Sequence, residues 1–218
     1  MNGETRLTQW FNATVITRTL LRIGILVPFL YFGTDFVSSL FYPGYSHVRQ
    51  YASELGVASA PHSQIFNAGM VMTGLAALLA APGFVAALRK LRCHATLSWL
   101  TFATIICFGV AMLMAGFFPW PDRRHGGFNI IFAVPAGPIL LLAALWREPL
   151  ARWIRVFLLA TIAAMIPMFA VMIRIVDLNT ATNGGVLQRI YGLALVPWIG
   201  IGSYALLRYM SSPGSEKF

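Results

Sequence analysis

Six long apolar stretches constrain the fold of this chain more than any other feature of its sequence. They cover about residues 20–41, 64–88, 97–118, 127–146, 153–176 and 186–207. A helix needs about 20 apolar residues to cross the ~30 Å hydrocarbon core of a bilayer, so each stretch is long enough. Only 11% of the 218 residues are charged, against about 25% in soluble domains. The sequence therefore predicts an all-α polytopic membrane bundle with six transmembrane helices.

The polar segments outside these stretches divide the chain into three parts. We expect residues 1–19 to form a cytoplasmic or interfacial lead-in and residues 20–207 to form the six-helix transmembrane domain. Residues 208–218 are expected to be a disordered cytoplasmic tail. Residues 1–16 lack an apolar core followed by a small-residue cleavage site, so the first span is expected to direct insertion.

Lysine and arginine set the predicted orientation. If the N-terminus is inside, the outer ends of the spans hold Arg49, Arg123, Arg124, Arg174 and Arg189, and the other eleven of the 16 Lys and Arg residues are inside. Cytoplasmic loops of membrane proteins collect these residues, so both termini are expected in the cytoplasm. Loop charges facing anionic lipid also account for the net charge of +9, and we expect no binding of nucleic acid.

Acidic side chains and histidines gather at the opposite, outer ends of the spans. Those at or near outer positions are Asp35, Glu54, Asp122 and Asp177, with the histidines His47, His62 and His125. Carboxylates and imidazoles carry acid–base chemistry, so this asymmetry favours the outer face as the place for a site.

The connection between the first two spans, residues 42–62, is longer than a bundle needs, and long loops are often functional. Ser53-Glu54-Leu55-Gly56 is expected to dip back into the bundle, where protein or a watery cavity must satisfy its backbone. Glu54 is therefore a candidate catalytic residue and Ser53 a candidate substrate-binding residue. The alternative is a solvated loop that carries interfacial tyrosines.

A second polar segment joins the third and fourth spans and contains Asp122, Arg123, Arg124 and His125. Asp122 is close enough in sequence to orient the His125 imidazole, an arrangement used for general bases and metal ligands. Both residues are candidate catalytic residues. The alternative is a charged turn whose arginines meet lipid phosphate.

A third set of candidates lies on or beside the spans. Asp35 lies about 9 Å below the end of the first span, where an ionisable group is costly and faces a bundle interior or cavity. Its expected partner is Arg174 or Arg189, in a candidate catalytic site or in a structural ion pair. Arg174 is also expected to pair with Asp177 on one helix face. Gln188, Arg189, Arg174 and Asn67 are candidate substrate-binding residues.

The sequence predicts no metal site and no cofactor. The three outer histidines lack the compact spacing of metal ligands. Catalytic-serine, phosphate-loop and dinucleotide glycine motifs do not occur.

Several short motifs occur in an order that resembles one bacterial and archaeal membrane family. The motifs are Tyr45-Ser46, Ser53-Glu54-Leu55-Gly56, Pro61, Phe66-Asn67-Ala68-Gly69, Phe118-Pro119, His125-Gly126 and Gly185-Val186-Leu187-Gln188-Arg189-Ile190. The family is known as domain of unknown function 998, and the likeness runs from about residue 42 to residue 198. A fainter likeness exists to the DRAM and Frag-type membrane proteins, which carry a similar acidic-glycine motif after their first span.

The resemblance implies a compact polytopic bundle with its motif residues on one side, and it brings no settled activity. By carry-over it marks Ser53, Glu54, Asn67, His125, Gln188 and Arg189. Asp122 matches the family pattern less clearly.

We therefore expect a multi-pass protein of the bacterial cytoplasmic (inner) membrane, with an outward-facing polar pocket for a lipid, isoprenoid or other amphiphile. In the enzyme version of this hypothesis, Glu54 or a His125–Asp122 pair acts as general acid or base. Arg189, with Arg174, holds an anionic group. The alternatives are a non-catalytic lipid- or partner-binding accessory protein and a small transporter.

Overall fold

The computed structural model describes residues 3–148, 152–178 and 181–210, with side chains from residue 13 onward. This part of the chain is helical and contains no strand, which confirms the all-α prediction. The α-helices are α1 (Gly3–Leu40), α2 (Ser63–Lys90), α3 (Ala95–Phe117), α4 (Ala136–Leu145), α5 (Arg152–Met172), α6 (Gly184–Leu195) and α7 (Pro197–Met210). Two short 3-10 helices are η1 (Ala52–Gly56) and η2 (Ile130–Ala133).

Five helical segments of the described chain are long and apolar enough to cross a membrane. They are Ala13–Leu40, Ser63–Lys90, Ala95–Phe117, Arg152–Met172 and Gly184–Met210. They agree with five of the six predicted spans, so the chain has the build of a multi-pass membrane protein.

The predicted fourth span, residues 127–146, is only partly helical. Asn129 has a positive φ of 71°, and the α-helix begins only after Pro135. Pro138 lies in the first turn of α4, where its missing N–H costs no helical bond. The ten residues of α4 measure about 15 Å, and the apolar helical run Ile130–Leu145, which begins with η2, is still shorter than the other five spans.

The first and last spans also differ in detail from the prediction. α1 is continuous from Gly3, so part of the expected lead-in belongs to the same helix as the first span. Pro197 lacks the N–H that would continue α6, and the last span therefore divides into α6 and α7 at Val196. Most of the expected C-terminal tail, residues 211–218, lies outside the described residues.

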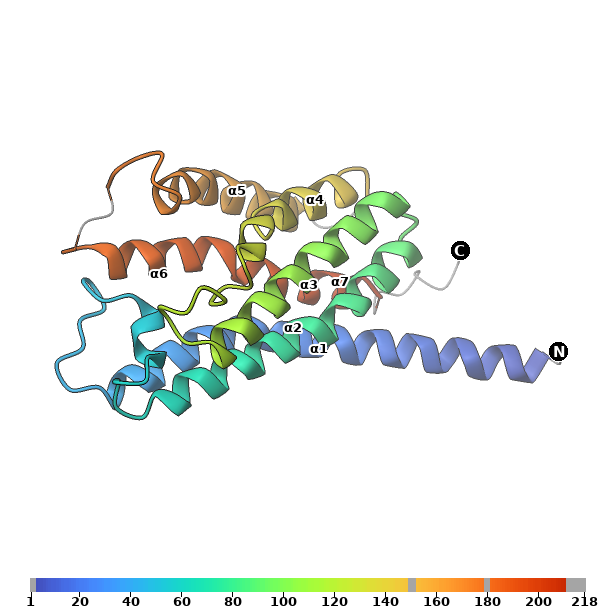
Figure 1. Cartoon of the computed structure of the whole chain (residues 1–218). Coiled ribbons are helices and arrows are strands. Elements are labelled where there is room, and N and C mark those ends of the chain that lie inside the picture. Colours follow the sequence, from blue (N-terminus) through green and yellow to red (C-terminus); the bar gives the residue numbers. More distant parts are fainter. Residues whose placement is uncertain (1–2, 149–151, 179–180, 211–218) are drawn as a thin grey trace.

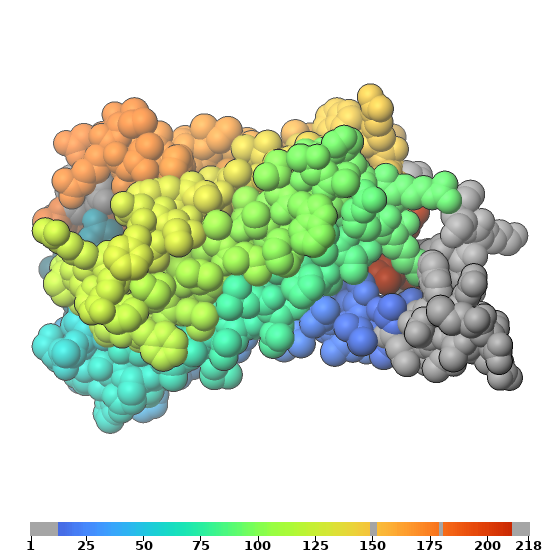
Figure 2. All heavy atoms as spheres, turned by 45° about the vertical axis from the view of Figure 1, so that its right-hand side comes forward, coloured from blue at the N-terminus to red at the C-terminus, as the bar shows by residue number. Residues whose placement is uncertain are grey.

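The helices form an elongated bundle in which α2 packs most extensively, against α1 on one side and α3 on the other (Figure 1). Figure 2 shows α2 and α3 running side by side across one face. They approach closely where two glycines meet, since a β-carbon on Gly74 would lie 2.6 Å from the carbonyl oxygen of Gly109. Beneath this layer the fully buried Trp198 of α7 meets the Phe84 ring edge to face at 6.2 Å.

The two ends of the bundle carry different connections (Figure 1). At the end that we call the termini end, α1 begins and α7 finishes, and the Arg18 side chain donates to the carbonyl oxygen of Met210 at 2.7 Å. Residues 91–94 and 146–148 lie at the same end. The opposite end, which we call the loop end, holds residues 41–62, 118–129 and 173–178. The outer candidate residues of the sequence analysis lie at or near the loop end.

Candidate functional site

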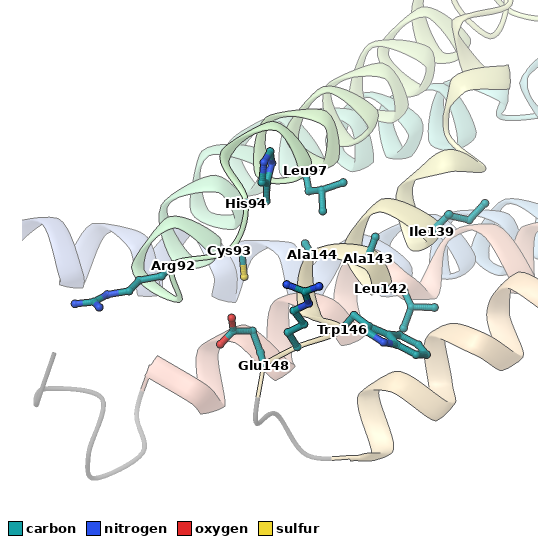
Figure 3. Close-up of a pocket in the computed structure, with 11 residues that line it drawn as sticks. Arg92, Cys93, His94, Leu97, Ile139, Leu142, Ala143, Ala144, Trp146 and Glu148 are labelled. Atoms are coloured by element: carbon teal, nitrogen blue, oxygen red, sulfur yellow. The ribbon is translucent and has the colours of Figure 1, made fainter.

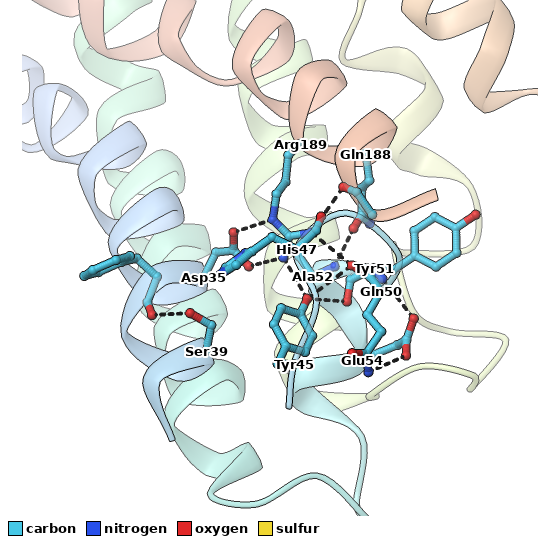
Figure 4. Close-up of polar contacts among 12 residues, drawn as sticks. Asp35, Ser39, Tyr45, His47, Gln50, Tyr51, Ala52, Glu54, Gln188 and Arg189 are labelled. Atoms are coloured by element: carbon cyan, nitrogen blue, oxygen red, sulfur yellow. Dashed lines mark hydrogen bonds and ion pairs between the residues drawn. The ribbon is translucent and has the colours of Figure 1, made fainter. Parts of the chain in front are cut away.

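The long loop of residues 41–62 is fixed to the bundle by the Arg189 guanidinium of α6 (Figure 4). All five N–H bonds of this group have acceptors, at donor–acceptor distances from 2.7 to 3.1 Å. The acceptors are the carboxylate of Asp35, the hydroxyl of Tyr45 and the backbone carbonyls of His47, Gln50 and Gly185. Arg189 thus joins α1, the loop and α6 at one point.

The partner predicted for Asp35 is confirmed for Arg189. Both carboxylate oxygens of Asp35 accept a bond from the guanidinium, Oδ2 from Nε at 3.0 Å and Oδ1 from Nη2 at 2.9 Å. A bidentate pair of this kind is the strongest form of arginine–carboxylate contact. The sequence left two roles open for Asp35, a catalytic residue or a member of a structural ion pair. The bidentate geometry supports the structural ion pair.

Tyr45 extends this ion pair into the loop. Its hydroxyl accepts from Arg189 Nη2 at 2.7 Å and donates to the carbonyl oxygen of Tyr51 at 2.8 Å. Burial raises the pKa of Tyr45 to about 12, although Arg189 acts in the opposite direction. The phenol therefore stays protonated at neutral pH and keeps the bond that it donates.

The segment Ser53-Glu54-Leu55-Gly56 forms most of η1 and dips into the bundle, with Leu55 only 2% exposed. The Glu54 carboxylate accepts the backbone N–H of Tyr51 at 2.8 Å and the side-chain amide of Gln50 at 3.3 Å. Glu54 thus holds the start of its own 3-10 turn.

Two amide side chains fasten η1 to the helices beside it. Gln188 of α6 accepts the backbone N–H of Ala52 at 2.6 Å, and its amide nitrogen lies 3.4 Å from the Ser53 hydroxyl. Asn67 of α2 donates to the carbonyl oxygen of Gly56 at 3.0 Å. These contacts satisfy the backbone of a dipping segment, as the sequence analysis required.

A cavity of about 340 Å³ lies beneath η1. Its walls come from α1, α2, α3, α5 and α6, and the segment 125–132 closes one side. The lining is mostly apolar, and its main polar members are Tyr31, Ser53, His125, Asn129, Gln188 and Tyr191. Of the predicted site residues, the cavity therefore brings together Ser53, His125 and Gln188.

His125 is oriented by the backbone and not by a carboxylate. Its Nδ1 lies 3.0 Å from the carbonyl oxygen of Phe118, which can only accept, so this nitrogen carries the proton. The lone pair is then on Nε2. Burial lowers the pKa of His125, against the opposing influence of Asp122 and of the backbone at Phe118 and Ala115, and the imidazole is neutral at pH 7.

The predicted Asp122–His125 side-chain pair is wrong. The Asp122 carboxylate binds Arg124 instead, at 3.0 Å to Nε, 2.7 Å to Nη2 and 2.8 Å to the backbone N–H. These bonds lower the pKa of Asp122 to about 2. Side chains two residues apart meet here because the segment is a tight turn and not a helix.

The predicted helical pair of Arg174 and Asp177 is also wrong. α5 ends at Met172, and Arg174 adopts a left-handed φ of 60° in the turn that follows. The two residues therefore share no helix face. Arg174 is not among the described residues that line the cavity.

The other two histidines of the loop end pack against aromatic rings. The ring of His47 packs against Tyr45 with centroids 5.2 Å apart, and that of His62 packs against Phe41 at 5.6 Å. Among the residues that the structure describes, no three His, Cys, Asp or Glu side chains gather as a group that could hold a metal ion.

Sequence reasoning missed Tyr31, Asn129 and Tyr191 as members of the cavity. A signal for Tyr191 was present, because it lies three residues after Gln188 and so shares a face of α6 with it. Asn129 follows a turn of positive φ from Gly126 onward, and its position depends on that turn.

Comparison with known proteins adds one finding. No curated protein and no solved structure matches this chain significantly. A family model described as protein of unknown function (DUF998) matches residues 25–204, which run from within α1 to within α7 and include η1 and the cavity. The resemblance seen in the motifs is thereby confirmed, and the chain belongs to this DUF998 family of membrane-like helical proteins.

Proposed function

We propose that the protein binds an uncharged amphiphile, of the class of isoprenoid alcohols and related lipids, in the cavity beneath η1. The observation that carries this proposal is the lining, in which apolar side chains surround a few polar groups. No described residue of the lining is Asp, Glu, Lys or Arg. A volume of about 340 Å³ lies at the lower end of small-molecule sites and suits the end of a lipid molecule better than a whole phospholipid.

The polar groups of the cavity suit a hydroxyl or carbonyl ligand. Within the described part of the chain, the hydroxyls of Tyr31 and Tyr191 make no hydrogen bond. A ligand hydroxyl can accept from one of these phenols and donate to the oxygen of the other at the same time. A buried ligand charge would be costly there because the neutral lining provides no opposite charge.

Neither of the arginines predicted to hold an anionic group lines the cavity. Arg189 uses all its N–H bonds within the fold, and Arg174 lies outside the lining. A phosphate or carboxylate in the cavity would have to break the Asp35–Arg189 pair to reach a charge. Hence the proposed ligand is neutral.

A second candidate function is catalysis on such a ligand, with His125 as the general base. The specific support is its tautomer, since the Phe118 carbonyl fixes the proton on Nδ1 and places the lone pair on Nε2. The lowered pKa keeps that lone pair unprotonated at neutral pH. In this version His125 replaces Glu54 and Asp122, whose carboxylates are bonded elsewhere.

Binding is tested with farnesol and farnesyl phosphate, two probes that differ in charge, added to delipidated protein before native mass spectrometry. The blocking variant is Gly192→Leu, because Gly192 lines the cavity and the atom nearest to an added β-carbon is 3.5 Å away. Gly33→Leu is the control, since nothing lies within 4 Å of its β-carbon.

We expect a farnesol adduct in the wild type and in Gly33→Leu, and its loss in Gly192→Leu. Farnesyl phosphate should bind at least about tenfold more weakly, because each 1.4 kcal/mol of uncompensated burial is a factor of ten. An adduct that survives in Gly192→Leu, or a preference for the phosphate, contradicts the proposal.

The catalytic version has a separate test. His125→Gln retains an amide donor for the Phe118 carbonyl but lacks the imidazole base, so it should bind the lipid alcohol and fail to convert it. Wild-type protein that binds the lipid alcohol without any product in the mass spectrum contradicts catalysis and leaves the binding function in place.

A further inference from the structure

A second hollow lies at the termini end, far along the bundle from the cavity beneath η1. It is an open groove of about 740 Å³ between the α2–α3 connection and α4 (Figure 3). Residues 92–94 and 97 form one side, and residues 139–148 of α4 and its C-terminal end form the other. None of these residues is shared with the first cavity, so the groove is a separate site.

The groove has an apolar floor that runs along the bundle. Leu97 of α3 and Ile139 and Leu142 of α4 line it, and Trp146 lies at its end with 55% of its surface exposed. The groove lies beside the C-terminal half of α4. Aromatic residues at the ends of spans lie at the level of lipid headgroups, which places Trp146 at this interface.

The rim of the groove carries a positive balance of charge. Arg92 and Arg147 are exposed cations in the lining, His94 is an exposed imidazole, and Glu148 is the one acidic residue among the described lining residues. Arg92 extends away from the groove in Figure 3. Arg147 and His94 also line the groove and are exposed, so both offer N–H donors there. The Cys93 thiol stays neutral, because burial and the nearby Glu148 raise its pKa to about 11.

We propose that this groove binds an anionic phospholipid, with its phosphate on Arg147 and His94 and an acyl chain on Leu97, Ile139 and Leu142. Arginine matches phosphate with two parallel N–H bonds, and an imidazole has at least one N–H donor in either tautomer. Arg92 adds attraction at longer range and offsets Glu148. A free phosphate ion would leave the apolar floor uncovered, and a zwitterionic lipid would bring a second cation toward the arginines.

The experiment compares dioleoylphosphatidylglycerol with dioleoylphosphatidylcholine by native mass spectrometry of the full-length, delipidated protein. The variant is Arg147→Gln, and the control is Arg123→Gln, an exposed arginine at the loop end. Loss of one charge-assisted bond should weaken retention of the phosphatidylglycerol about tenfold in Arg147→Gln. The control should match the wild type.

Three results would overturn the proposal. The first is equal retention of the two lipids, and the second is equal weakening by Arg123→Gln. The third is displacement of phosphatidylglycerol by millimolar inorganic phosphate, which would identify a soluble-anion site in place of a lipid site.

A second measurement places the acyl chain. Phosphatidylglycerol with brominated acyl chains should quench tryptophan fluorescence, and the quenched fraction should fall in Trp146→Phe. Trp99→Phe is the matched control, since Trp99 is an exposed tryptophan of α3 that does not line the groove. An equal fall in both variants would contradict the placement.

Discussion

Arg189 and Asp35 join α6 to α1 through two parallel bonds of 3.0 and 2.9 Å, although they are 154 residues apart in the chain. The side chains are only 17% and 13% exposed. The same guanidinium binds the loop that contributes Ser53 to the cavity. The ion pair thus holds in place the loop that covers the cavity, and it is not a binding site for an anionic ligand.

Breaking this pair should destabilise the protein. Asp35→Asn removes the charge that compensates Arg189, and loss of one partner of a buried pair costs about 3–5 kcal/mol. We expect about 3 kcal/mol, the lower end, because both side chains keep some exposure. The measurement is the free energy of unfolding in mixed micelles titrated with sodium dodecyl sulfate.

The exposed pair of Asp122 and Arg124 is the matched control, with the two side chains 30% and 48% exposed. Asp122→Asn should leave the unfolding curve unchanged, because exposed ion pairs are screened by solvent. Equal losses in the two variants would show that the Asp35–Arg189 pair has no special structural role.

Most of the membrane-spanning helices could be predicted from the sequence, because the length of an apolar stretch determines whether it can cross a bilayer. The fourth span was the exception. Asn129 has a positive φ and the α-helix starts only after Pro135, and neither feature changes the pattern of apolar residues from which the span was predicted. The depth of Asp35 within the first span was enough to predict that its partner is an arginine. The choice between Arg174 and Arg189 depended on where α5 ends, which the apolar pattern does not mark.

Gly185 allows the loop to lie against the first turn of α6. A β-carbon there would lie 2.7 Å from the carbonyl oxygen of His47 and closer still to that of Gln50. Gly185→Ala should therefore displace the loop and cost about 1–3 kcal/mol, the usual range for overpacking. Limited proteolysis within residues 42–62 should become faster.

The control for this change is Gly33→Ala in α1, where no atom lies within 4 Å of the added β-carbon. Replacement of a helical glycine by alanine stabilises by about 0.5–1 kcal/mol, so proteolysis should be unchanged or slower. Slower cleavage in Gly185→Ala as well would contradict the close approach.

His125 should make stability depend on pH in one direction. Its pKa in the folded protein is lowered from the ordinary value of 6.5, chiefly by burial. Well above pH 6.5 the imidazole is neutral in both states and the contribution to stability is fully present. As the pH falls below 6.5, the unfolded chain takes up a proton that the folded protein does not, and stability falls until the folded pKa is passed.

The midpoint temperature of unfolding, measured from about pH 8 to about pH 5, tests this effect across the range in which histidine titrates. The wild type should lose more stability below pH 6.5 than His125→Gln, which lacks the titrating group. Parallel curves for the two proteins would contradict a lowered pKa at His125.

The sequence predicted only some of the residues that come together in the cavity. Ser53, His125 and Gln188 all carried a motif signal, and the cavity brings them together. The roles of Glu54 and Asp122 could not be predicted, because their bonds to Tyr51 and Arg124 follow from local turns. A carboxylate with a local donor needs no distant partner, and spacing alone does not reveal which donor it finds.

Gln188 should hold η1 more firmly than the Ser53 hydroxyl beside it. Its side-chain oxygen accepts the Ala52 N–H at 2.6 Å, whereas its nitrogen lies 3.4 Å from Ser53, beyond the usual length of a strong bond. Ala52 is only 8% exposed, so Gln188→Ala leaves a buried N–H without an acceptor, at a cost of about 1–3 kcal/mol. Hydrogen exchange of residues 50–57, followed by mass spectrometry, should become faster in Gln188→Ala and stay near the wild-type rate in Ser53→Ala. The reverse order would mean that the hydroxyl, and not the Ala52 amide, anchors η1 to α6.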